Sequence, residues 1–391
     1  MTKKTKIAIV HDSLTEFGGA ERMLFSLVKI FPQADIYTSL AKKKIVHQLQ
    51  EKTTGQIYFS KLSKFSLATK YPSFFKPYFY HYYWPKLNLD QYDLVISSSH
   101  SFCANSVRVK NKHLSYIHTP PRFLYEEFNE MNWLRWPIIK GLFKPYFNFL
   151  RKRDWQNVQK IDLILSNSQN VKDRIKKYYD RDSQIIYPPI KIPTKIKKQV
   201  KSKKTHYLFF SRLVKQKGIE LVIKTFNQNQ KPLLVVGTSQ QAQKWKKMAK
   251  DNIKFLGFVS DQKMPQIYAQ SKALVYASIQ EDFGMVPVEA MSHGLPVIAY
   301  YEGGIKETVI NQKTGLFFKQ YNEKSLNETI TLFEKMKFSE KECFKQAQKF
   351  NEDLFTKKII AISTSLLEKK KPTSAPQSNT SAKVSSAHST T

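Results

Sequence analysis

The stretch from Ser278 to Gly294 reads SIQEDFGMVPVEAMSHG, and it follows a short apolar run, ALVYAS, that has strand character. Pro287 stands at a natural first position of a helix, and Gly294 is placed to end it. The stretch therefore predicts a strand, a loop and a helix in succession. We expect Glu281 in the loop and Glu289 in the first helical turn, so that both carboxylates can reach one ligand.

The predicted loop offers groups for an anion as well as for hydroxyls. Backbone N–H groups beside the positive end of a helix dipole suit a phosphate, and here they belong to Phe283, Gly284, Met285 and Val286. A Glu near a helix start is commonly a capping residue, and an exposed loop Glu is usually solvated. The combination nevertheless predicts a ligand that carries both a phosphate and a polyol.

Short apolar runs alternate with amphipathic stretches on both sides of this segment. The chain has 391 residues, of which 41% are hydrophobic, and this is enough for two domains with separate cores. Buried parallel strands read as continuous apolar runs. The predicted strands are KIAIVHDS, ADIYTS, QIYFS, DLVISSS, HLSYIHT, IDLILSNS and SQIIYP in the first half, and HYLFF, KPLLVVG, NIKFLGFVS, ALVYAS, LPVIAY and TGLFF in the second. This pattern predicts two doubly wound α/β domains.

Three other predicted strands end in loops with polar or flexible residues. Gly18 and Gly19 in HDSLTEFGGAERML could admit a phosphate or form a plain tight turn. His118 ends the strand HLSYI, where open α/β sheets bind ligands, although a histidine there is often structural. Arg212 and Lys217 follow HYLFF and could converge on a diphosphate, but such pairs are common in a chain with 64 Lys and Arg residues.

Taken together, these motifs resemble a known enzyme family. The segment EDFGMVPVE, the Gly-Gly-Ala-Glu loop and the Arg and Lys after HYLFF are similar to those of the retaining nucleotide-sugar glycosyltransferases of family 4, the glycosyl transferases group 1. The string His-Thr-Pro-Pro-Arg resembles the branch that contains bacterial mannosyltransferases for surface polysaccharides. The customary Gly before the Arg is replaced by Ser211, and YPPIKIP lacks the usual Asn-Pro and acidic residue near the hinge.

The resemblance implies a role for each candidate residue on the donor side. Glu281 and the adjoining amides would hold the donor sugar, and Glu289 would bind the ribose hydroxyls. The Gly18-Gly19 loop would face the donor diphosphate, and Gly257 in GFVS would mark the nucleobase site. The catalytic group would comprise His118 beside the donor sugar, Glu281, and the two cations Arg212 and Lys217 that neutralise the leaving diphosphate. No metal or other cofactor is expected.

The fold implied by the resemblance is GT-B, in which two Rossmann-like domains face an interdomain cleft. The expected divisions are an acceptor-side domain at 1–190, a nucleotide-sugar domain at 205–345, a C-terminal helix at 346–370 that crosses back to the first domain, and a disordered tail at 371–391. The function implied is transfer of a hexose, foremost mannose from GDP-mannose, to a lipid-linked oligosaccharide or polysaccharide precursor with retention. Alternatives are a UDP-sugar donor, a nucleotide-sugar 2-epimerase, or a basic nucleic-acid-binding protein without enzymatic activity.

The net charge of +33 is the least explained property of the sequence. Nucleic acid, an anionic membrane surface and a Lys-rich genome bias are competing explanations, and we favour the membrane. Residues 52–89 and 131–153 each contain six basic residues, no acidic residue and many aromatic rings, as interfacial segments do, although helices packed on a core would look similar.

No apolar run reaches 18 residues, the N-terminal apolar segment is too short for a signal peptide, and there are two Cys. We expect a protein of the cytoplasm, or one bound peripherally to the inner face of the cell membrane.

Overall fold

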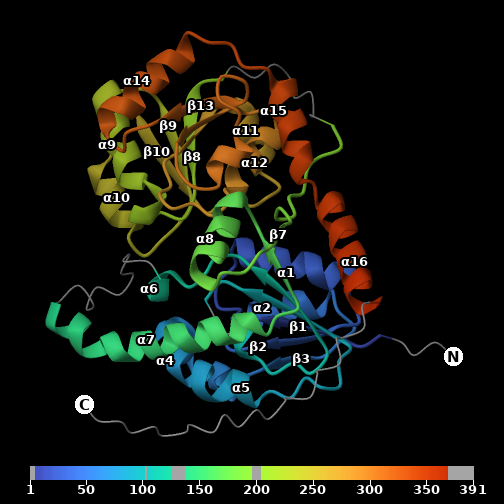
Figure 1. Ribbon diagram of the computed structural model, residues 1–391. Coiled ribbons are helices and arrows are strands. Elements are labelled where there is room, and N and C mark those ends of the chain that lie inside the picture. The colour runs from blue at the N-terminus through green and yellow to red at the C-terminus, as the bar shows by residue number, and fades with distance from the viewer. Residues whose placement is uncertain (1–4, 102–103, 126–136, 196–203, 369–391) are drawn as a thin grey trace, which may run out of the picture.

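The structure is a computed structural model that describes residues 5–101, 104–125, 137–195 and 204–368. Figure 1 shows two lobes stacked one above the other, each with a sheet between helices. The tail at 371–391 lies outside the described residues, as do 196–203 of the Lys-rich linker.

The first domain contains a parallel sheet of seven strands in the order β3-β2-β1-β4-β5-β6-β7. Its strands are β1 Ile7–His11, β2 Asp35–Thr38, β3 Ile57–Phe59, β4 Leu94–Ser99, β5 Lys112–Ile117, β6 Leu163–Ser166 and β7 Gln184–Ile185. Its helices are α1 Gly19–Ile30, α2 Lys43–Gln50, α3 Ser66–Lys70, α4 Pro72–Tyr78, the π-helical turn η2 Phe79–Tyr83, α5 Trp84–Lys86, α6 Arg122–Tyr125, α7 Pro137–Gln159 and α8 Gln169–Tyr179. The strand order reverses between β1 and β4, which is where doubly wound sheets bind ligands.

The second domain contains a parallel sheet of six strands in the order β10-β9-β8-β11-β12-β13. Its strands are β8 His206–Phe210, β9 Leu233–Val236, β10 Ile253–Gly257, β11 Ser271–Tyr276, β12 Val297–Tyr300 and β13 Gly315–Phe318. Its helices are the 3₁₀ turn η5 Lys215–Lys217, α9 Ile219–Asn229, α10 Ala242–Met248, α11 Met264–Gln270, α12 Met285–Ser292, α13 Ile305–Thr308, α14 Glu323–Glu334 and α15 Glu340–Ala347. The α/β class and the two doubly wound sheets are confirmed.

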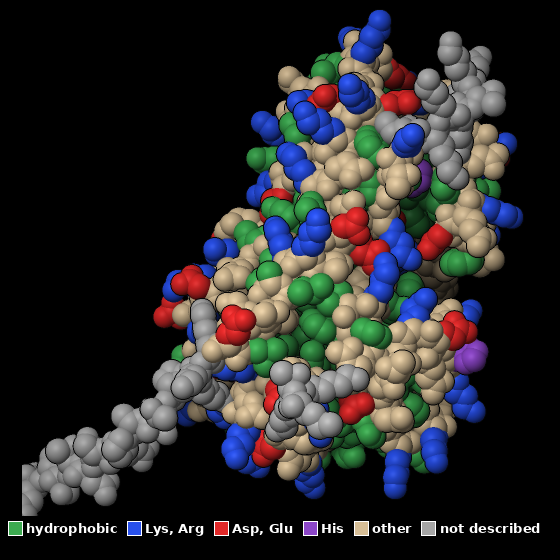
Figure 2. All heavy atoms as spheres, turned by 90° about the vertical axis from the view of Figure 1, so that its right-hand side faces the viewer, with side chains coloured by type: hydrophobic (Ala, Val, Ile, Leu, Met, Phe, Trp, Pro, Cys, Tyr) green, Lys and Arg blue, Asp and Glu red, His purple; other side chains and the backbone are tan. Residues whose placement is uncertain are grey.

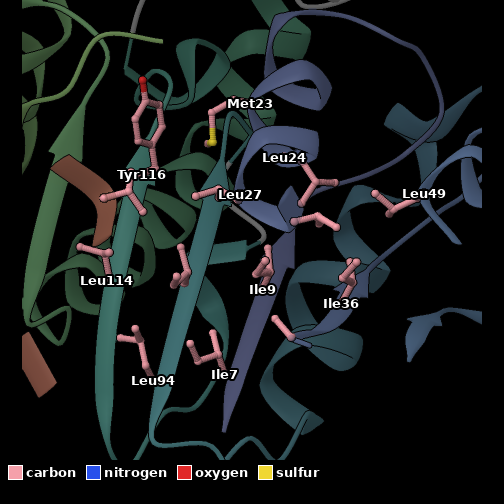
Figure 3. Packing of buried hydrophobic residues seen from close by; sticks show 14 of the residues in the cluster. Ile7, Ile9, Met23, Leu24, Leu27, Ile36, Leu49, Leu94, Leu114 and Tyr116 are labelled. Carbon is pink, nitrogen blue, oxygen red and sulfur yellow. The ribbon is translucent and has the colours of Figure 1, made fainter. Parts of the chain in front are cut away.

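The C-terminal helix α16, Glu352–Glu368, packs on the first domain although it follows the second in sequence. Phe355, Ile359 and Leu366 belong to the core that α1 forms against the first sheet. Figure 3 shows the α1 part of this core, with the side chains of Met23, Leu24 and Leu27 lying over the strands. Burying one large apolar side chain contributes about 2 kcal/mol, so this contact is a substantial link between the C-terminus and the first lobe.

The aromatic and basic segments divide between core and surface. In the segment from α3 to α5, Phe79, Tyr80 and Trp84 are buried. Five other large side chains in the same segment are exposed, namely Leu67, Tyr71, Phe74, Tyr78 and Tyr82, and so is Phe65, which directly precedes α3. Helix α7 is divided in the same way, with Leu150 and Val158 buried and Leu142, Phe143, Phe149 and Trp155 exposed. Residues 131–136 of the second basic segment lie outside the described residues.

Candidate active site

The loop between β11 and α12 places Glu281 against a lysine from another loop of the same sheet. Lys217, the last residue of η5, donates from Nζ to Glu281 Oε2 at 2.8 Å, and the Tyr276 hydroxyl donates to the same oxygen at 2.5 Å. Burial acts to raise the pKa of Glu281, but the charge and hydrogen bond of Lys217 outweigh it and lower that pKa to about 2. The site therefore holds an ionised carboxylate beside an ammonium group.

Two glycines fix the backbone of this loop. A Cβ on Gly303 would lie 2.2 Å from the carbonyl oxygen of Glu281, and a Cβ on Gly304 would lie 2.1 Å from that of Asp282. The Gly304 N–H donates to the Glu281 carbonyl at 2.8 Å. The glycine pair after β12 thus allows the acidic loop to approach closely, and any side chain there would displace it.

Helix α12 begins at Met285, earlier than we predicted from Pro287. Gly284, with φ of 89°, is the N-cap, so Pro287 is the third helical residue and Glu289 lies beyond the first turn. The physical reason is that glycine can adopt the left-handed conformation that turns the chain directly into the helix. The first N–H groups of a helix have no partner within it, so those of Met285 and Val286 remain available as anion donors. Phe283 contributes its backbone only, because its ring is buried between Tyr187 and Phe350.

The two domains touch at the glycine loop. A Cβ on Gly19, the first residue of α1, would lie 3.0 Å from Met285 Sδ. One turn further along α1, Arg22 forms a short ion pair with Glu289. Burial raises the pKa of Glu289, and Arg22 acts in the opposite direction. The carboxylate expected to bind ribose is therefore paired with a first-domain arginine that we had not singled out.

Arg212 and Lys217 contact different carboxylates. Arg212 Nη1 lies 3.1 Å from Glu16 Oε2 of the first domain, and both side chains are largely exposed. An ion pair in this setting is weak and leaves the guanidinium available to another anion. Gly257 has a φ of 70° and open space around the position of a Cβ, and its carbonyl accepts the N–H of Gly237 at 2.8 Å.

His118 follows β5 and is held on two sides. Its Nε2 lies 3.0 Å from Ser98 Oγ, and its carbonyl accepts a hydrogen bond from Asn167 Nδ2 at 2.9 Å. Burial lowers the pKa of His118 well below its ordinary value, and His100 and His11 lower it further. The ring is therefore a neutral imidazole at physiological pH.

Four residues around His118 were missed by the sequence analysis. They lie at the ends of β1 and β4 and at the start of α1, and they are His11, Asp12, Glu21 and His100. The Asp12 carboxylate accepts the N–H groups of His100, Ser101 and Ala104 at 2.6–2.8 Å and so shapes the loop after β4. The available signal was positional, because HD and SSSH end two strands that flank the reversal of strand order.

Arg122, the arginine of the His-Thr-Pro-Pro-Arg string, binds the second domain. It donates to the Gln280 side chain at 2.8 Å, to the Gln280 carbonyl at 2.5 Å and to Asp282 Oδ1 at 2.7 Å. Arg174 of α8 donates to the same Asp282 oxygen at 2.6 Å. We call Arg122, Arg174 and Asp282 the arginine clamp. It holds the loop after His118 against the loop that carries Glu281.

Within the described residues, no group of three or more His, Cys, Asp or Glu side chains is arranged to hold a metal ion.

Comparison with known proteins identifies the second domain. Residues 191–350 match the family described as Glycosyl transferases group 1. This domain is a group 1 glycosyltransferase domain. The group 1 match includes Lys217, Glu281 and Glu289, whereas His118 and the Gly18-Gly19 loop lie outside it.

Curated relatives extend the similarity into the first half of the chain. The O-antigen chain mannosyltransferase RfbU of Salmonella typhimurium is 31% identical over 204 residues, which cover 49% of this chain and 56% of that protein. The chain thus spans about half the length of that relative. The alpha-1,3/1,6-mannosyltransferase ALG2 of Candida albicans is 26% identical over 385 residues, which cover 78% of this chain and 84% of the relative.

Solved structures share the fold of the whole chain. Anabaena HepE, crystallised with UDP and glucose, superimposes with a TM-score of 0.66 at 19% identity and covers 93% of this chain and 100% of its own. The lipopolysaccharide outer core galactosyltransferase WaaB gives a TM-score of 0.66 at 17% identity, with 92% and 99% covered. At this identity the likeness establishes the fold alone, and it confirms the GT-B architecture.

Proposed function

We propose that the protein is a retaining glycosyltransferase that moves mannose from GDP-mannose to a lipid-linked oligosaccharide or polysaccharide precursor. The observation that carries the proposal is the pair formed by Glu281 and Lys217 at 2.8 Å, next to the N-terminus of α12 and opposite the glycine loop of the first domain. RfbU and ALG2 are mannosyltransferases, and this supports mannose as the sugar.

The proposed chemistry depends on charge at the leaving diphosphate. As the bond from the anomeric carbon to phosphate weakens, negative charge develops and must be met by fixed cations and amide dipoles. Lys217, Arg212, the amides of 284–286 and the Gly18-Gly19 loop would supply them, and the mechanism uses no metal or other cofactor. In this scheme Lys217 exchanges part of its contact with Glu281 for a phosphate oxygen.

The two carboxylates would bind hydroxyl groups of the donor. Glu281 is ionised and would accept hydrogen bonds from the hexose, with His118 on the opposite domain. Glu289 would bind the ribose, for which the ribose hydroxyls must replace Arg22. Because Arg22 extends from α1, it would remain close enough to neutralise a donor phosphate after this exchange.

A UDP-sugar is the second candidate donor, because HepE was crystallised with UDP and glucose. The proposed nucleobase region around Gly257 would contact the base through backbone groups, so its residue types do not indicate whether guanine or uracil is bound. Thermal shift with GDP and UDP, followed by hydrolysis of GDP-mannose, UDP-glucose and UDP-GlcNAc, would choose between them. Stabilisation by neither nucleotide and no turnover of any donor would contradict the proposed function.

The acceptor is proposed to be presented at an anionic membrane surface, on the inner face of the cell membrane. The exposed rings of α4 and η2, together with Leu67 of α3 and with Leu142 and Phe143 of α7, are accompanied by lysines, a composition suited to a lipid headgroup layer. None of the helices in the described ranges is both long and apolar enough to cross a bilayer. Figure 2 shows Lys and Arg side chains spread over both lobes of the face it draws, so the charge there is not gathered into one nucleic-acid stripe.

Flotation with liposomes tests this part independently of the donor. We expect flotation with vesicles that contain anionic lipid and little with neutral vesicles. Indifference to lipid charge would point to genome bias as the origin of the net charge of +33. Tight binding to duplex or single-stranded nucleic acid with a steep salt dependence, without any transferase activity, would favour the nucleic-acid alternative.

A further inference from the structure

A chain of polar contacts links Glu21 to His118 through two intermediate side chains. Ser98 Oγ lies between two imidazoles, 3.0 Å from His11 Nδ1 and 3.0 Å from His118 Nε2. His11 Nε2 in turn faces Glu21 Oε1 at 3.6 Å. His11, Ser98 and Glu21 are all at most 7% exposed, so water does not readily replace these contacts.

The serine hydroxyl couples the proton positions of the two rings. A hydroxyl has one proton to donate and can accept through its lone pairs, and a neutral imidazole carries a proton on one nitrogen only. If Ser98 donates to His11 Nδ1, then His118 Nε2 must carry the proton that Ser98 accepts. If Ser98 donates to His118 Nε2, then His11 Nδ1 must carry it instead. The tautomer of His118 therefore depends on that of His11.

Glu21 decides between these two arrangements. Its Oε2 accepts the N–H of Gly18 at 2.8 Å, and its Oε1 faces His11 Nε2. Burial acts to raise the pKa of Glu21, but the contact with His11 outweighs it and lowers that pKa to about 2, so the group is a carboxylate. A lone pair on His11 Nε2 facing this anion inside the protein would be repelled. When the His11 ring carries a single proton, that proton is therefore placed on Nε2, and Nδ1 accepts from Ser98. A ring with a proton on both nitrogens would instead donate to Ser98 and reverse the arrangement at His118.

We infer that His11 carries a single proton, on Nε2, and that this relay holds His118 in the Nε2–H tautomer and leaves its Nδ1 as a hydrogen-bond acceptor for a hydroxyl group of the donor sugar. Glu21, His11 and Ser98 are positioning residues in this inference, because they act through His118. Nothing in the described part of the chain forms a hydrogen bond with His118 Nδ1. The identification of the hydroxyl as one of the donor sugar rests on the proposed function, whereas the tautomer does not.

The inference sets the chemical class of ligand that His118 can recognise. An unprotonated Nδ1 accepts a hydrogen bond, so it pairs with a sugar hydroxyl and repels a phosphate oxygen, which is also an acceptor. The opposite tautomer would donate a hydrogen bond and so would favour phosphate. The same Glu21 that orders the glycine loop would thus direct the hydroxyl-bearing part of the donor toward His118.

Glu21→Gln is the most informative variant, because its amide can reverse the relay without removing it. The amide oxygen can still accept from Gly18, while the amide NH₂ can donate to His11 Nε2. That nitrogen then accepts, His11 Nδ1 carries the proton, Ser98 donates to His118 Nε2, and the proton of His118 moves to Nδ1. The variant changes a residue that does not contact His118, so a purely local structural role would leave the His118 ring as it is.

Histidine ¹⁵N NMR at pH 8 reads this directly, with His118 assigned by the loss of its signals in His118→Gln. We expect an unprotonated Nδ1 in the wild type, a shift toward a protonated Nδ1 in Glu21→Gln, and loss of that response when Glu21→Gln is combined with Ser98→Ala. His206 in the second domain is the internal reference, and Glu16→Gln is the matched change of charge outside the relay. A protonated Nδ1 in the wild type, or a His118 ring that ignores Glu21→Gln, overturns the inference.

A kinetic measurement with GDP-mannose tests the role of the acceptor. We expect Glu21→Gln to lower kcat/KM about tenfold, which is the scale of one lost hydrogen bond. When Ser98→Ala is present, Glu21→Gln should cause no further change in kcat/KM. A wild-type protein with no turnover would contradict the proposed function and leave the NMR result standing. An unchanged kcat/KM in an active Glu21→Gln enzyme would overturn the role assigned to the His118 acceptor.

Discussion

Substituting Asp282 with Asn tests whether the arginine clamp holds the two domains together. Asp282 Oδ1 receives charge-assisted hydrogen bonds from Arg122 at 2.7 Å and from Arg174 at 2.6 Å, and the three side chains are 13–24% exposed. Burial raises the pKa of Asp282 and the two guanidinium groups oppose it, so the carboxylate depends on both arginines for its charge. Asp282→Asn keeps the shape and removes the charge.

The expected cost follows from these contacts. A hydrogen bond to a charged group contributes about 1.5–3 kcal/mol, and partial exposure to water reduces this value. Two such bonds give about 3 kcal/mol that favours the closed arrangement over an open one. A coupling of this size shifts the equilibrium between closed and open forms on the order of 100-fold.

Small-angle X-ray scattering of the wild type and of Asp282→Asn gives the readout, and the variant should have a larger radius of gyration. Glu334→Gln is the matched control, because Glu334 pairs with Lys231 at 2.7 Å inside the second domain. We also expect a higher KM for the donor in Asp282→Asn, with an unfolding temperature for each domain close to that of the wild type. Scattering curves that superimpose for Asp282→Asn and wild type would refute the clamp.

Three further predictions concern the site, the core and the surface. Lys217→Ala should lower transfer by about 10²–10³-fold, because it removes a cation from the proposed diphosphate site and leaves burial to raise the pKa of Glu281. Glu281→Ala should abolish transfer, and circular dichroism should show both variants folded. Unchanged turnover in either would remove that residue from the site. Asp154 is buried, which raises its pKa to about 7, so the folded protein retains a proton that the unfolded chain loses near pH 4. Wild-type stability should therefore fall by about 1.4 kcal/mol per pH unit between these values, and urea unfolding at pH 5 and pH 7 should show this slope reduced in Asp154→Asn. Phe74→Ser, at a side chain that is 78% exposed, should weaken flotation with anionic liposomes, whereas Phe258→Ser, at 81% in the second domain, should not; equal effects would contradict a membrane surface on the first domain.

The strands were the most predictable part of the fold. The central strands are buried on both faces of a parallel sheet, so the sequence of such a strand is a largely apolar run, as in ALVYAS for β11. Helix starts were less predictable. Pro287 suggested a start at that residue, whereas the left-handed conformation of Gly284 lets α12 begin at Met285. The aromatic segment before β4 could not be divided into core and surface, since aromatic residues occupy both faces of its helices.

Pairings within one sheet could be anticipated, and those between domains could not. Lys217 and Glu281 both follow strands of the second sheet, and the carboxyl ends of parallel strands meet at one edge, so their proximity follows from the topology. The partners of Glu289 and Asp282 come from the other domain. The hydrophobic periodicity of each half does not indicate how the two sheets face each other. The pairing of Arg22 with Glu289 and of Arg174 with Asp282 therefore could not be predicted from the sequence.

Adjacent carboxylates in the acidic loop would connect the proposed donor binding to domain closure. Glu281 turns toward Lys217 and Tyr276 within the second domain, whereas Asp282 turns toward the arginines of the first. The backbone of both residues is held against Gly303 and Gly304, so a backbone movement at one of them is passed to the other. A donor that draws Lys217 away from Glu281 would therefore alter the position of Asp282 in the arginine clamp. Because Arg122 lies four residues after His118, the same movement would reach the imidazole on the other side of the donor, and closure would align both halves of the site in one step.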